Sequence, residues 1–154
     1  MTTYKSTAVT AGSMPDFGVP AGVLLCRTGE YTTENDNMVS GDTIEMVPVP
    51  KYARIIDMQF YCNETQDLSG FTCTEIGDAN SNARFFNLTT MGDASAFWKQ
   101  LYADGAKQKE GYFDVTQDDT IDIYLKTGVT KVATGMKFVI NVIYKMVGSI
   151  SDES

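Results

Sequence analysis

The sequence predicts an all-β protein, namely an antiparallel β-sandwich or jelly roll with an extended N-terminal arm. Short runs alternate between apolar and polar residues with a period of two, and turn-forming residues separate these runs at regular intervals. No alternation of strands with long helices occurs. The 154 residues suit one domain, and we expect the sandwich to span residues 21–147.

Residues 1–20 form the predicted arm, because their glycines and prolines interrupt both helices and strand ladders. The arm also has apolar side chains with which it can dock on a partner, namely Met14, Phe17 and Val19. A flexible N-terminus without a docking role is an equally good interpretation of the same composition.

Seven segments of the domain have the composition of strands. In chain order, these are Val23–Cys26, Thr43–Val47, Ala53–Cys62, Phe71–Ile76, Arg84–Leu88, Thr120–Leu125 and Lys137–Lys145. In the last segment, every second residue from Phe138 to Tyr144 is apolar, so that these side chains would share one face. Pro48 and Pro50 follow the second segment, and proline is expected to stop a central strand there.

One segment, residues 93–105, departs from the strand pattern. It begins with a capping residue, Asp93, ends with Gly105, and has Phe97 and Leu101 four residues apart, which is typical of a short helix. A loop with aromatic side chains is nearly as consistent with the composition. After the last strand, residues 148–154 are predicted to form a flexible acidic tail.

The charge and the missing histidine argue against several classes of function. The net charge is −8 and no basic stripe is present, so nucleic acid is not an expected partner. Because the chain has no histidine, it lacks the parts of a Ser-His-Asp triad or a histidine-ligated metal site. Neither a Gly-rich phosphate loop nor a dinucleotide motif occurs. We therefore expect neither an enzyme nor a bound cofactor.

The sequence also predicts a protein that stays in the cytoplasm where it is made. No apolar run approaches the roughly 20 residues that cross a bilayer, and the first residues lack the apolar stretch of a signal peptide. No membrane contact is expected. In this reducing compartment, we expect Cys26, Cys62 and Cys73 to be three buried thiols and not disulfide partners.

Two acidic clusters have both a chemical and a structural interpretation. Asp118 and Asp119 are adjacent, and adjacent residues of a strand point to opposite faces, so a turn is favoured over a catalytic carboxylate pair. Residues 78–82 space oxygen ligands two apart, as a calcium loop does. Ala83 stands where that loop needs glycine and Thr89 where it needs glutamate, so an Asx turn is favoured and no metal is assigned.

Aromatic residues gather in the second half of the chain, at Phe97, Trp98, Tyr102, Tyr112 and Phe113. Such a cluster can form a sugar-binding platform, but a core or a contact between subunits is favoured. We therefore predict partner contacts at Phe97, Trp98 and Tyr102, in addition to the three apolar residues of the arm.

Four stretches of turn and strand pattern resemble a known class of protein. They are residues 5–20, residues 42–57, the turn Gly77–Asp78 followed by Arg84–Phe85, and residues 118–123. Over most of its length the chain resembles the capsid decoration, or cement, proteins of tailed bacteriophages. The resemblance implies a jelly-roll or related sandwich that binds the outside of the major capsid lattice, stabilises the head and forms dimers or trimers.

The expected partner is therefore the major capsid protein, and the expected location is the capsid surface of the virion, after synthesis in the host cytoplasm. Three alternatives stay open. The chain is a tail, baseplate or head–tail adaptor protein, or a carbohydrate-binding or receptor-binding module that uses Trp98, or an enzyme that uses Asp118 in a carboxylate pair.

Overall fold

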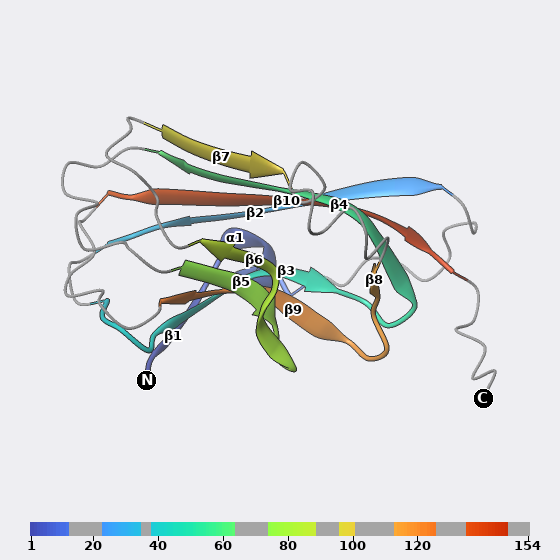
Figure 1. Ribbon diagram of the computed structural model, residues 1–154, viewed down its shortest axis with the longest axis horizontal. Coiled ribbons are helices and arrows are strands. Elements are labelled where there is room, and N and C mark those ends of the chain that lie inside the picture. Colours follow the sequence, from blue (N-terminus) through green and yellow to red (C-terminus); the bar gives the residue numbers. More distant parts are fainter. Residues whose placement is uncertain are drawn as a thin grey trace.

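The computed structural model describes residues 1–12, 23–34, 38–63, 74–88, 96–100, 113–125 and 135–147. In this part of the chain, the strands form two sheets that lie one over the other (Figure 1). The elements are β1 (Thr3–Lys5), α1 (Thr7–Thr10), β2 (Leu24–Thr32), β3 (Thr43–Val49), β4 (Ala53–Asn63), β5 (Thr74–Asp78), β6 (Ser81–Leu88), β7 (Ala96–Gln100), β8 (Phe113–Asp114), β9 (Asp119–Leu125) and β10 (Lys137–Met146).

The first sheet has the strand order β1-β3-β9-β5-β6, and the second has the order β2-β10-β4-β7, with β8 paired to one end of β4. All strand pairs are antiparallel except β1 with β3, which is parallel. This arrangement confirms the predicted all-β sandwich.

The core lies between the two sheets and follows from the period of two. Along β10 the burial alternates without a break, because every second side chain from Phe138 to Met146 points between the sheets. In the first sheet, Ile121 and Ile123 of β9 face the core in the same way. The rings of Phe60 and Phe138 stack at 6.4 Å between their centroids.

At one side of the sandwich, a glycine allows the two sheets to approach each other closely. Gly29 of β2 is buried, and a Cβ atom built there would overlap the backbone carbonyl of Met46 on β3. Only a residue without a side chain permits this approach. The edge strand of the second sheet therefore rests directly on a strand of the first sheet.

The first residues of the chain pack on the sandwich, which differs from an arm that is extended throughout. β1 pairs with Thr43–Glu45 of β3, and α1 contacts both β2 and β3. Ser6 is fully buried between them: its hydroxyl donates to the carbonyl of Met46 and accepts from the N–H of Val9, as a helix N-cap. Residues 13–20 of the predicted arm lie outside the described residues, and both predicted domain boundaries remain predictions.

All seven predicted strands are confirmed, although their ends differ and residues 71–73 of the fourth fall outside the described part. Pro48 does not stop β3, which continues to Val49. β1 pairs with β3 only as far as Glu45, so that Pro48 lies where this edge of β3 has no partner among the described strands. A proline there costs no hydrogen bond of the sheet, because no described strand on that side would accept one from its nitrogen.

The predicted helix or loop over residues 93–105 is wrong for residues 96–100, which form β7. This strand pairs with Gln59–Asn63 at the end of β4, on the side that β10 does not use. A short helix is marginal on its own, whereas an exposed strand edge provides a full set of backbone partners, so tertiary pairing prevails. In the part of the chain that the structure describes, no helix is long and apolar enough to cross a membrane.

Candidate functional site

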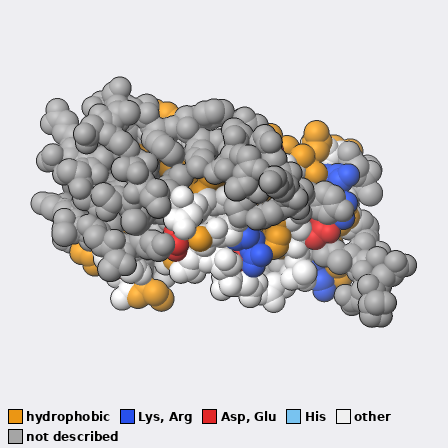
Figure 2. Space-filling model, viewed as in Figure 1, with side chains coloured by type: hydrophobic (Ala, Val, Ile, Leu, Met, Phe, Trp, Pro, Cys, Tyr) orange, Lys and Arg blue, Asp and Glu red, His pale blue; other side chains and the backbone are white. Residues whose placement is uncertain are grey.

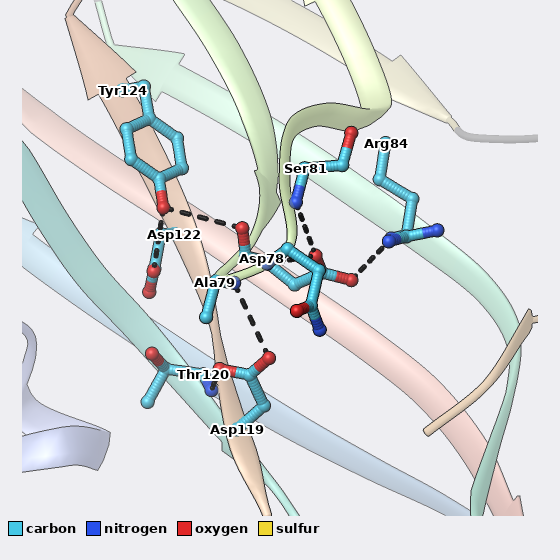
Figure 3. Close-up of polar contacts among 9 residues, drawn as sticks. Asp78, Ala79, Ser81, Arg84, Asp119, Thr120, Asp122 and Tyr124 are labelled. Carbon is cyan, nitrogen blue, oxygen red and sulfur yellow. Dashed lines mark hydrogen bonds and ion pairs between the residues drawn. The ribbon is translucent and has the colours of Figure 1, made fainter. Parts of the chain in front are cut away.

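Polar residues of the first sheet gather where the β5–β6 hairpin meets β9 (Figure 3). Asp78 ends β5, and its Oδ1 atom accepts hydrogen bonds from the N–H groups of Asn80 and Ser81 at 3.0 and 2.9 Å. Its Oδ2 atom forms an ion pair with Arg84 of β6. The predicted Asx turn is confirmed, and both carboxylate oxygens already have protein partners.

The two adjacent carboxylates at the start of β9 serve separate turns. Asp119 accepts hydrogen bonds from the N–H groups of Thr120, at 2.8 Å, and Ala79, at 3.4 Å. Asp118 instead accepts from the N–H of Lys51 at 2.8 Å. The predicted turn is therefore confirmed, and the contacts of these two side chains are those of backbone supports.

Asp122, in the middle of β9, is buried like Asp42 and Asp78, but one of its carboxylate oxygens has no hydrogen-bond partner among the described residues. The hydroxyl of Tyr124 lies 3.4 Å from its Oδ2 atom and 3.3 Å from the backbone carbonyl of Asp78 (Figure 3). Burial raises the pKa of Asp122 to about 7, and the charges of Glu45 and Asp119 act in the same direction. The pKa of Tyr124 is raised to about 12, mainly by burial and by Asp122.

The cysteines give no reactive site in the described part of the chain. Cys62 is buried, and burial raises the pKa of its thiol to about 12, which leaves almost no thiolate at neutral pH. Cys26 is exposed, so the prediction of a buried thiol is wrong there; it lies on the outer face of the edge strand β2. Cys73 lies outside the described residues. Among the described side chains, no group of three or more acids or cysteines is placed to hold a metal ion.

The outer faces of both sheets carry charged residues, which the strand registers place in rows. Residues that are paired across antiparallel strands share a face. On the first sheet, the outward residues include Glu45 paired with Asp122, and Glu75 paired with Tyr124. On the second sheet, most rows also include a charged residue, such as Glu30 beside Val139 and Asp57 beside Ile143. The row of Thr28, Asn141 and Gln59 is uncharged. Asn141 accepts a hydrogen bond from Thr28 at 2.7 Å within this row.

Exposed apolar side chains lie near the ends of strands. Val23 and Leu24, at the start of β2, are 45% and 62% exposed. Leu24 is paired with Lys145, which in turn is paired with Arg54, so the apolar start of β2 has cations beside it. On the face drawn in Figure 2, orange side chains are visible at both ends of the molecule, with blue ones near the right-hand end. This end of the second sheet is suited to contact with another protein.

The predicted contact residues can be placed only in part. Phe97 and Trp98 lie in β7, where the backbone register pairs them with Cys62 and Tyr61 of β4. Tyr102, Met14, Phe17 and Val19 lie outside the described residues. Their role as partner contacts therefore remains a prediction. Sequence reasoning did not single out the exposed start of β2, although its apolar run was recognised as a strand.

No protein-family model matches this chain, and no curated protein matches it at a significant level. Solved structures with a similar fold do exist. A chain of the capsid of Ralstonia phage GP4 has a TM-score of 0.72 and 14% sequence identity, and the match covers 96% of this chain and 99% of that chain.

Two further structures have the same type of fold. A chain of the cyanophage Pam1 capsid asymmetric unit has a TM-score of 0.60 and 14% identity, with 88% of this chain and 92% of that chain covered. A chain of the acidic stable capsid structure of Helicobacter pylori bacteriophage KHP30 has a TM-score of 0.57 and 11% identity, with 82% and 90% covered. At such identities the likeness concerns the fold.

Proposed function

We propose that this chain is a structural protein of a phage virion that binds the outside of the major capsid lattice and stabilises the head. The observation that carries the proposal is the fold likeness, over 96% of the chain, to a chain from a phage capsid. Two further capsid structures contain a chain of the same fold, which supports the same assignment.

The coverage of the neighbouring chains agrees with a subunit that consists of a single sandwich. The matched fold accounts for 90 to 99% of each neighbouring chain, so that a sandwich of this kind makes up nearly all of each one. A small subunit that consists of one sandwich agrees with the decoration type that the sequence resembles. Its expected work is adhesion to the major capsid protein, and it needs no catalytic group for that.

Features of the described surface agree with such adhesion. The uncharged row of Thr28, Asn141 and Gln59 and the exposed apolar start of β2 can be buried against a partner with little desolvation of charge. The net charge of −8 disfavours binding to the packaged genome. Assembly as a dimer or trimer and location on the virion surface, after synthesis in the host cytoplasm, belong to the same proposal.

The arm residues Met14, Phe17 and Val19 and the aromatic residues Phe97, Trp98 and Tyr102 are the proposed partner contacts. Apolar and aromatic side chains contribute most of the binding free energy at protein interfaces. A contact made by a linked segment also raises the effective concentration of the others. Each copy would thereby bridge neighbouring capsid subunits and oppose their separation.

The test is to add the purified protein to shells assembled from the major capsid protein and to image the particles by electron cryomicroscopy. We expect many copies at equivalent lattice positions over the shell. A few copies at one vertex would instead indicate a tail or adaptor protein and would overturn the proposal. Glycan binding that is lost in Trp98→Ala would indicate a carbohydrate-binding module.

A second experiment tests the proposed arm contacts without removing β1. The variant combines Met14→Ser, Phe17→Ser and Val19→Ser, and we expect at least a tenfold loss of affinity for the shells, since apolar anchors are lost. The matched control combines Thr7→Ser and Thr10→Ser at exposed positions of α1. Equal affinity of the variant and the control would show that the arm makes no contact.

A further inference from the structure

A buried carboxyl group stands in the middle of the first sheet. The strand register places four residues side by side in one row across the first sheet. They are, in order, Lys5 of β1, Glu45 of β3, Asp122 of β9 and Gly77 of β5. Asp122 is 5% exposed, and its Oδ1 atom has no hydrogen-bond partner among the described residues. A carboxylate in this position is costly, because one of its oxygens is buried without a donor from the described part of the chain.

The groups that face Asp122 from the neighbouring strands do not supply a free cation. On β3, Glu45 is an anion that is ion-paired with Lys5 of β1 at 3.8 Å, and this lysine is 60% exposed. On the other side, Gly77 has no side chain, because the backbone of Ser81 and Asn82 occupies the space where a Cβ atom would lie. Neither adjacent strand therefore compensates a negative charge on Asp122.

The remaining neighbours come from β5 and from β9 itself. The carboxylate of Asp78 is held by Arg84, so that this cation is engaged elsewhere. Within β9, Asp119 is a further anion, whereas Tyr124 provides a hydroxyl at 3.4 Å. Burial is the main cause that raises the pKa of Asp122, Glu45 and Asp119 add to it, and the hydroxyls of Thr120 and Tyr124 oppose it.

We propose that Asp122 is a proton-binding switch of the first sheet. With its proton, Asp122 lets β3, β9 and β5 close around it; when the proton passes to solvent, the pairing of these strands loosens to admit water. The effect extends to the N-terminal segment, because Lys5 is ion-paired with Glu45 and the N–H of Ser6 donates to the carbonyl of Glu45 at 2.8 Å. This proposal concerns the isolated chain and does not rest on the proposed function.

The test follows the carboxyl carbon of Asp122 by NMR, together with amide hydrogen exchange, between pH 5.5 and 8.5. We expect Asp122 to titrate about three pH units above an ordinary aspartate. The amides of β3 and β9 should lose protection, corrected for the intrinsic pH dependence of exchange, by about tenfold through the same midpoint. Titration of Asp122 below pH 5, or protection that is constant over this range, would overturn the proposal.

Three variants separate a switch from a merely structural residue. Asp122→Asn keeps the shape of the neutral side chain, so protection should stay high and lose its pH dependence. Glu45→Gln removes the facing anion, and the Asp122 midpoint should fall by roughly half a unit to one unit. Glu34→Gln removes one exposed carboxylate and should leave the midpoint unchanged. A pH dependence that persists in Asp122→Asn refutes the switch; if this variant does not fold, the shift in Glu45→Gln decides.

Discussion

At the scale of single residues, glycine at position 29 determines how closely the sheets pack. Replacing it in Gly29→Ala would place a methyl group on the backbone carbonyl of Met46, which no side-chain rotation can relieve. We expect a loss of at least about 2 kcal/mol in the free energy of unfolding, as for other overpacked cores. Urea unfolding measures it. The control is Thr32→Ala, an exposed position of the same strand, and an equal loss in both variants would contradict the close approach.

Individual residues were predictable from the sequence where their contacts are local. The turn at Asp78 depends on N–H groups two and three residues further along, and this spacing is visible in the sequence. The burial of Asp122 was not predictable. Its position in an alternating strand indicates an outward side chain, and a single strand does not show how its neighbours in the sheet affect the exposure of that side chain. Cys26 is exposed because β2 lies at a sheet edge, and a single strand does not reveal its place in the sheet.

At the scale of elements, the strands with clear alternation were predicted, and those created by their neighbours were not. β10 alternates over its whole length and lies in the middle of its sheet, so the pattern is complete. β1 and β8 have three and two residues, which is too short for any periodicity. β7 formed where capping signals indicated a helix, since β4 offers it a free edge.

The N-terminal segment depends on one buried hydroxyl. In Ser6→Ala, the carbonyl of Met46 loses a donor and the first turn of α1 loses its cap. We expect a cost of about 1–2 kcal/mol in the free energy of unfolding and faster amide exchange in β1. Ser40→Ala, at an exposed turn, should leave both quantities unchanged. Unaltered exchange in Ser6→Ala would indicate that the strand pairing alone holds this segment.

At the scale of the whole molecule, the fold class followed from the sequence, but the order of the strands did not. Sequential strands such as β2, β3 and β4 alternate between the two sheets, and no local pattern specifies this crossing. The same holds for the proposed contact surface. Its uncharged row combines residues more than 100 positions apart, such as Thr28 and Asn141.

The stability of the whole molecule should depend on pH in an unusual direction. For most acids in folded proteins the pKa is lowered, and stability falls in acid. Asp122 has a folded-state pKa of about 7, above the ordinary value of 3.8, so the folded state binds more protons than the unfolded state between these values. The contribution of Asp122 to stability is therefore fully present below about pH 4, declines as the pH rises to about 7, and is constant above that.

Asp122→Asn isolates this contribution, because it removes the titration and keeps the neutral shape. Between pH 4 and 7, the free energy of unfolding of the wild type should fall relative to that of the variant by on the order of 2–4 kcal/mol. Urea unfolding of both proteins at several pH values measures the difference, in which the titrations of the other carboxylates cancel. A constant difference over this range would mean that Asp122 is ionised in the folded protein and has found a donor for its second oxygen. In that case water must reach the middle of the first sheet, and the closed packing of β3, β9 and β5 around the carboxyl group would be incorrect.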